Sequence, residues 1–175
     1  MVTKKSIWIL IGMVVIMAWI LGSATQAGAQ TYIVKCRETG HVPKVQVIEV
    51  GDVPGHIIGV AELAAVLSCD DGSVATTSAK FMTDLTQGSG KARSYWMATY
   101  EDGSTIRAIG QNTITVNPDG KTARFEGPLE NIKGTGRFEG IKGGGSITGK
   151  RLAALPGAGA QYYVDYTATY TLPSK

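Results

Sequence analysis

The sequence predicts an all-β protein, a single antiparallel closed barrel of about eight strands. Three observations predict this class. From Thr31 onward the chain runs in short alternating segments rich in Val, Ile, Thr and Tyr, a pattern typical of antiparallel strands. Turn residues separate these segments at hairpin-sized intervals, and no convincing long helix interrupts them. A meander of this length must protect its edge strands, and closure into a small barrel does so most simply.

Residues 1–29 have the features of an export signal. Lys4 and Lys5 give a basic start, an uncharged apolar run extends from Ile7 to Leu21, and Ala27 to Ala29 fits the small-x-small pattern that a signal peptidase accepts. We expect cleavage after Ala29 and an exported protein, periplasmic or secreted, with no membrane attachment afterwards. The alternative is an uncleaved anchor, because the apolar run approaches the roughly 20 residues that a spanning helix needs.

The charge distribution argues against nucleic acid and anionic membranes as partners. The chain has 17 Lys and Arg against 14 Asp and Glu, and the signal segment holds two of the basic residues and none of the acidic ones. The mature chain is therefore nearly neutral, and its basic residues stand singly among acidic ones rather than in a patch. Its length suits one globular domain over 30–175. Within it we expect an N-terminal strand segment over 30–54 and the barrel over 55–175.

Cys36 and Cys69 are the only cysteines, and in an exported chain they predict one disulfide. The alternative is a nucleophilic thiol, for which His41 and His56 are the only histidine bases available. The sequence contains no CxxC, HExxH or GxSxG motif. We therefore expect no metal site, no hydrolase nucleophile and no cofactor.

Turn signals mark the predicted strand boundaries. In each of them Gly or Asn can take the positive φ that a tight turn demands. They are "GDVPG" at 51–55, "DDG" at 70–72, "QGSG" at 87–90, "EDG" at 101–103, "NPDG" at 117–120 and "LPGAG" at 155–159.

The segment "GVAELAAVL" at 59–67 is rich in good helix formers. We nevertheless expect a strand, because "DDG" follows at once and "SVATTSAKF" resembles a returning partner. The alternation of apolar and polar residues is clearer over 104–116 and at the C-terminus. One face of each strand is apolar, with Asn112 as the odd polar member: Ile106, Ala108, Gly110, Asn112, Ile114 and Val116 in the first, and Tyr162, Val164, Tyr166, Ala168, Tyr170 and Leu172 in the second.

The glycine-rich stretch 133–150 matches the spacing GxxxxGK of a phosphate-binding loop at Gly144, Gly149 and Lys150. The residue that follows is Arg151, so the hydroxyl that would hold Mg²⁺ is missing, and Pro156 leaves little room for a helix. Glycine here is better explained by the bends and close backbone approaches of a closed barrel. We expect Gly134, Gly136 and Gly140 to surround Phe138, which closes one end of the core.

The run "GTGRFEGIKGGGSITGK" followed by "YYVDYTATYTL" resembles the C-terminal half of allene oxide cyclase and dirigent-type barrels, a calycin-like architecture. It is most similar to bacterial exported proteins with an allene-oxide-cyclase-like barrel domain. The resemblance covers roughly 55–172 and implies that "GHIIGVAEL" forms the opening barrel strand. By position it makes Glu62 the match to the cyclase glutamate. Both plant families form trimers, so a monomer and a homo-oligomer both stay open.

Three functions remain open at this point. The first is binding of a small apolar or aromatic molecule in the barrel, and the second is a cyclase or isomerase that uses Glu62 as acid or base. The third is a structural or interaction module of the cell envelope whose side chains fill the barrel. The candidate ligand-binding residues are Trp96, Tyr100, Asn112, Tyr166 and Tyr170.

Overall fold

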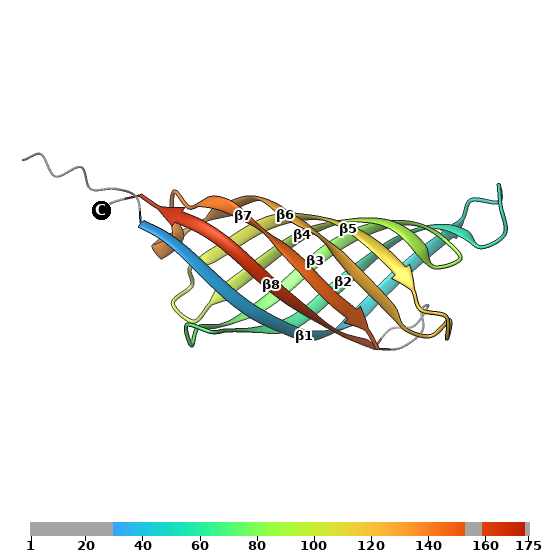
Figure 1. The fold of residues 1–175 in the computed structure, drawn as a ribbon, viewed down its shortest axis with the longest axis horizontal. Coiled ribbons are helices and arrows are strands. Elements are labelled where there is room, and N and C mark those ends of the chain that lie inside the picture. Colours follow the sequence, from blue (N-terminus) through green and yellow to red (C-terminus); the bar gives the residue numbers. More distant parts are fainter. Residues whose placement is uncertain (1–29, 153–158, 174–175) are drawn as a thin grey trace, which may run out of the picture.

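The structure, a computed structural model, describes residues 30–152 and 159–173. The expected export signal and most of the "LPGAG" turn lie outside these residues. Eight antiparallel strands follow one another around a closed barrel, which confirms the predicted fold class (Figure 1). They are β1 (Gln30–Glu49), β2 (His56–Cys69), β3 (Val74–Thr86), β4 (Ser89–Tyr100), β5 (Thr105–Val116), β6 (Ala123–Gly134), β7 (Lys142–Arg151) and β8 (Ala160–Leu172), with a 3-10 helix η1 (Gly136–Phe138) between β6 and β7.

The first strand, β1, closes the barrel. Its residues 30–42 pair with β8, and its residues 36–49 pair with β2. The expectation that "GHIIGVAEL" opens the barrel is therefore wrong, because β1 precedes it and pairs on both sides. Residues 36–41 of this 20-residue strand pair on both sides, and each end of the strand extends along one neighbour.

A disulfide joins Cys36 on β1 to Cys69 on β2, as the cysteine count predicted. The two residues face each other in the β1–β2 register. Both side chains pack against the buried core at the end of the barrel where β2 finishes. The bond therefore ties the closing strand to its neighbour.

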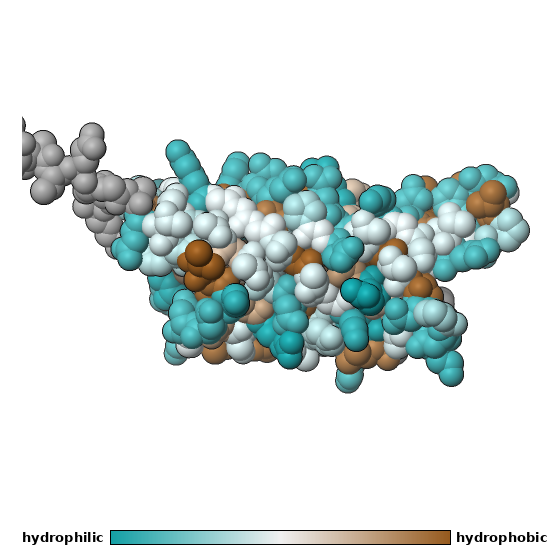
Figure 2. Space-filling model, in the orientation of Figure 1, coloured by the Kyte–Doolittle hydropathy of each residue, from teal (hydrophilic) through white to brown (hydrophobic). Residues whose placement is uncertain are grey.

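Alternation along β2 shows how the sequence divides between the two faces. Ala61 and Leu67 are buried inside, whereas Ile58, Val60 and Val66 on the other face are each about half exposed. The segment "GVAELAAVL" is thus a strand, as expected, with apolar residues on both sides. Figure 2 shows the outcome on one outer face, where separate hydrophobic residues lie among hydrophilic and neutral ones.

One end of the barrel is closed by η1, at the left in Figure 1. Phe138 is buried there, and its ring centroid lies 4.9 Å from that of Tyr100. Gly136 has φ +62°, and a Cβ on it would collide with the Ser104 hydroxyl. Glycine is needed at this position for both reasons.

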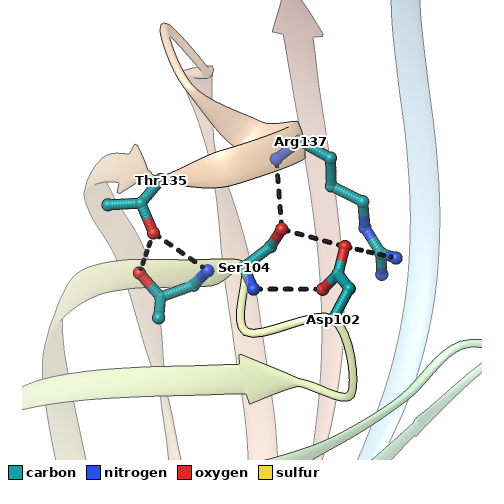
Figure 3. Close-up of polar contacts among 5 residues, drawn as sticks. Asp102, Ser104, Thr135 and Arg137 are labelled. Carbon is teal, nitrogen blue, oxygen red and sulfur yellow. Dashed lines mark hydrogen bonds and ion pairs between the residues drawn. The ribbon is translucent and has the colours of Figure 1, made fainter.

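Polar contacts hold this closed end together (Figure 3). The Ser104 hydroxyl donates to Oδ2 of Asp102 at 2.9 Å and accepts from the Arg137 backbone N–H at 3.1 Å. The Arg137 guanidinium is 3.3 Å from the same carboxylate and lies over the rings of Tyr100 and Phe138. Arg137 thus links the β4–β5 turn to η1. No helix among residues 30–152 and 159–173 is long and apolar enough to cross a membrane.

Candidate ligand-binding cavity

The barrel interior contains a cavity of about 100 Å³. Its wall extends from Trp96, near the middle of the barrel, to Leu85 and Arg151, near the strand ends opposite η1. Most of the wall is apolar, which favours an apolar occupant. This volume is about two-thirds of the roughly 150 Å³ apolar cavity that holds a benzene ring, so the occupant is a compact molecule of at most one ring. The apolar wall includes Leu63, Phe81, Ile114, Phe125, Leu129, Ile147 and Val164.

A buried carboxylate, Glu38, forms part of this wall. The inner face of β1 places it inside the barrel, where the residue is only 1% exposed. Trp96 donates its indole N–H to Oε2 at 2.7 Å, and the Tyr162 hydroxyl donates to Oε1 at 3.1 Å. Both carboxylate oxygens therefore have donors, as a buried carboxyl group requires.

Two tyrosines share this environment with Glu38. Burial raises the pKa of Tyr162, and the charge of Glu38 adds to the effect. Burial also raises the pKa of Tyr166 well above its usual value, with further contributions from the charges of Glu38 and Tyr162. The rings of Trp96 and Tyr166 lie 5.5 Å apart. Both hydroxyls therefore stay protonated at neutral pH and act as hydrogen-bond donors.

Other polar residues line the wall formed by β3, β4 and β5. They are Thr83, Ser94 and Asn112, one on each strand. Oδ1 of Asn112 is buried without a hydrogen-bond partner. Arg151 also lines the cavity, at the end of β7, and burial lowers the pKa of its guanidinium.

The structure separates the sequence-predicted ligand residues into two groups. Trp96, Asn112 and Tyr166 line the cavity together. Tyr100 and Tyr170 lie instead at the closed end, where both line a second hollow beside Phe138. Burial raises the pKa of Tyr100 to about 12. Tyr170 stacks on Tyr32 with ring centroids 5.2 Å apart. These two rings fill the closed end rather than line the cavity.

Glu62 does not lie inside the barrel, so its prediction as the acid or base of the cavity needs correction. Its side chain is 41% exposed and forms an ion pair of 2.7 Å with Lys80, which is itself exposed. The hydrogen bond and the charge of Lys80 lower the pKa of Glu62. The neighbours Ala61 and Leu63 face inward, so alternation along β2 turns Glu62 outward. Apolar residues on both faces of this strand concealed which face is the inner one.

Glu38 was not among the predicted site residues, although the sequence contains a signal for it. Along β1 the alternate residues Val34, Cys36 and Val42 form a mostly apolar series, and Glu38 is its charged member. A carboxylate on the apolar face of a strand indicates a buried polar site, because burying such a group without a reason is costly. Asn112 is the corresponding polar member of the apolar face of β5.

Comparisons with known proteins agree with this architecture. No protein-family model matches the sequence, and no curated protein matches it. The structure is similar to that of the pterocarpan synthase dirigent protein GePTS1, with a TM-score of 0.51 and 14% sequence identity over 87% of this chain and 96% of that chain. It is also similar to the pterocarpan synthase dirigent protein PsPTS1, with a TM-score of 0.50 and 11% identity over 83% of this chain and 97% of that chain. The chain therefore has the dirigent and allene oxide cyclase type of barrel fold that its glycine-rich segment resembled.

Proposed function

We propose that this protein is an exported β-barrel that binds one small, mostly apolar molecule inside the barrel. The observation that carries the proposal is the interior cavity, whose apolar wall contains the buried, hydrogen-bonded carboxylate of Glu38. A protein whose barrel served only as a rigid module would gain stability by filling this space with apolar side chains. Export is supported by the signal-like residues 1–29 and by the disulfide.

The expected ligand is small. Sites for drug-sized molecules measure roughly 300–1,000 Å³, and this cavity measures about 100 Å³. The rings of Trp96 and Tyr166 offer aromatic surface on one side. The volume and the chemistry of the wall therefore favour a compact molecule with at most one aromatic or aliphatic ring.

Native mass spectrometry of protein purified from the producing cell tests the proposal, together with titration of a panel of fluorescent apolar probes. We expect a bound small molecule, or probe binding that saturates at one site per chain. A cavity-filling variant, Ala92→Phe, should weaken probe binding by at least about tenfold, because the added ring occupies the volume that a ligand needs. Val60→Phe is the matched control, since Val60 lies on the outer face. Absence of any ligand and any probe binding would favour an envelope module instead.

A second candidate function is a cyclase or isomerase of the same shape. It is favoured by the burial of Glu38 beside a cavity, where confinement and an acid or base act together. Glu38 takes the role that the sequence suggested for Glu62. Once a ligand is known, Glu38→Gln should still bind it but should fail to convert it. Conversion at the wild-type rate by Glu38→Gln would exclude this mechanism.

A further inference from the structure

Asn112 carries an unusual feature, a buried amide oxygen that accepts no hydrogen bond. Thr77 Oγ1 is the other buried side-chain polar atom without a partner in the described part of the chain. Most buried polar atoms in proteins are paired, and an unpaired one costs roughly 1–3 kcal/mol. The two residues differ in position, because Asn112 lines the cavity and Thr77 does not.

Small residues surround the side chain of Asn112 on the inner face of β4 and β5, although its amide oxygen itself is buried. In the β4–β5 register Asn112 lies opposite Ala92, and Gly110 precedes it on the inner face. Neither residue has a side chain beyond Cβ, and the nearest polar side chain on β4 is that of Ser94, which lies opposite Gly110. A Cβ built on Gly110 would lie 3.4 Å from Nδ2 and 3.5 Å from Oδ1 of Asn112, so the amide group turns along the strand toward Gly110. This direction leads toward the middle of the barrel, where Trp96 lies.

The cavity offers acceptor atoms from two walls. Glu38 contributes carboxylate oxygens from β1, and Asn112 contributes its amide oxygen from β5. The donors next to Glu38, on Trp96 and Tyr162, are already directed at its carboxylate. The amide oxygen of Asn112 has no such partner.

We propose that Asn112 determines ligand specificity by accepting a hydrogen bond, and that the ligand is a compact apolar molecule carrying one hydroxyl or N–H donor. This inference rests on the proposed binding function and adds the chemistry of the ligand to it. A donor on the ligand pairs the buried oxygen, whereas a purely hydrocarbon ligand of the same shape leaves it unpaired. The buried amide oxygen therefore weakens binding of the hydrocarbon and strengthens binding of the ligand that carries a donor.

Aniline and toluene form a matched pair of probes for this idea. They have nearly the same shape and each contains one benzene ring, but only aniline can donate a hydrogen bond. The dissociation constant of each is measured by protein-observed NMR titration with the wild-type protein and with Asn112→Leu. We expect the ratio of the toluene to the aniline constant to fall by about fivefold in Asn112→Leu, as the loss of one net hydrogen bond implies.

Two further variants make the result specific. Asn112→Asp keeps an acceptor and removes the amide N–H₂, so it should retain the wild-type preference for aniline. It also provides an independent test if Asn112→Leu fails to fold. Thr77→Val removes the other unpaired buried oxygen away from the cavity and should leave the ratio unchanged.

The outcomes separate the two proposals. Both probes could bind while Asn112→Leu keeps the wild-type ratio of the dissociation constants, or while Asn112→Asp loses the preference for aniline. Either result would mean that Asn112 does not select for a donor, and the proposed binding function would still stand. If neither probe binds the wild-type protein, the inference and the proposed function fail together.

Discussion

The indole N–H of Trp96 lies 2.7 Å from Oε2 of Glu38, although the two residues are 58 positions apart in the chain. They belong to β4 and β1, which are not neighbours in the barrel, so the bond crosses the interior. Its buried partners make it stronger than a similar bond at the surface. The candidate site thus depends on a polar contact through the core as well as on the shape of the cavity.

Removing the charge of Glu38 should destabilise the protein. In Glu38→Gln an N–H₂ group replaces one oxygen that accepts from Trp96 or Tyr162, so a donor then faces a donor. We expect the free energy of unfolding to fall by about 1–3 kcal/mol, measured by urea denaturation. Glu62→Gln is the control and should leave the midpoint unchanged, because its ion pair with Lys80 is exposed. Equal losses of unfolding free energy in Glu38→Gln and Glu62→Gln would contradict the buried position of Glu38 inside the barrel.

The disulfide should contribute substantially to stability. Cys36 and Cys69 are separated by 33 positions, and in the loop-entropy account a cross-link of this length stabilises by on the order of 3–4 kcal/mol. We expect reduction to lower the free energy of unfolding by that amount. The double variant Cys36→Ser with Cys69→Ser should match the reduced protein and should not respond to reductant. A wild-type protein that is equally stable with and without reductant would disagree with this expectation.

Two glycines separate the effect of backbone conformation from that of packing. Gly136 and Gly120 have similar φ values, +62° and +66°, but only Gly136 has close neighbours. Alanine at either position should cost roughly 1–2 kcal/mol for its left-handed conformation. Gly136→Ala should cost more, because its Cβ would collide with the Ser104 hydroxyl. Thermal denaturation of both variants measures the difference, and a larger loss in Gly120→Ala would show that η1 does not need this close contact.

His56 should make stability depend on pH. Its Nε2 lies 2.9 Å from Oδ1 of Asp84, and its Nδ1 lies 2.5 Å from Oδ1 of Asp52. The hydrogen bonds with Asp84 and with Asp52 raise the pKa of His56 above its usual 6.5. A raised folded pKa means that protonated His56 stabilises the fold fully below pH 6.5 and loses this effect as the pH rises through the folded value.

Melting temperatures of wild type and His56→Gln, measured from about pH 5.5 to about pH 8.5, test this prediction. The advantage of the wild type should be largest at the acidic end and should shrink as the pH rises. If the melting-temperature difference between wild type and His56→Gln stays constant or grows with pH, the carboxylates of Asp52 and Asp84 do not raise the pKa of His56 as described.

Much of the fold could be predicted because its signals are local. Turn residues such as Gly72 and Gly103, both at positive φ, mark strand ends, and period two in β5 and β8 shows which residues share a face. Even the helix-prone "GVAELAAVL" was recognisable as a strand from its neighbours. The role of β1 was harder to predict, since its pairing with β8 joins residues 118 or more positions apart and pairing at such distances leaves no local pattern.

The candidate site was predicted in part. Trp96, Asn112 and Tyr166 line the cavity, whereas Tyr100 and Tyr170 share their faces but lie nearer the closed end. Alternation tells which face a residue is on, but not its depth along the barrel axis. Glu62 was misplaced for a related reason, because both faces of β2 are apolar and only the closed sheet shows which is inside.

The sequence by itself determined the elements: the turns, the alternating strands, the cysteine pair and the glycine-rich segment that shapes one end. These depend on φ preferences and on period two, which act over a few residues. Only the tertiary structure decided that Glu38, Trp96 and Tyr162 meet, and that Asn112 has an unpaired oxygen in the same cavity. Such contacts are set by barrel closure and strand register, which bring together side chains that no local rule connects.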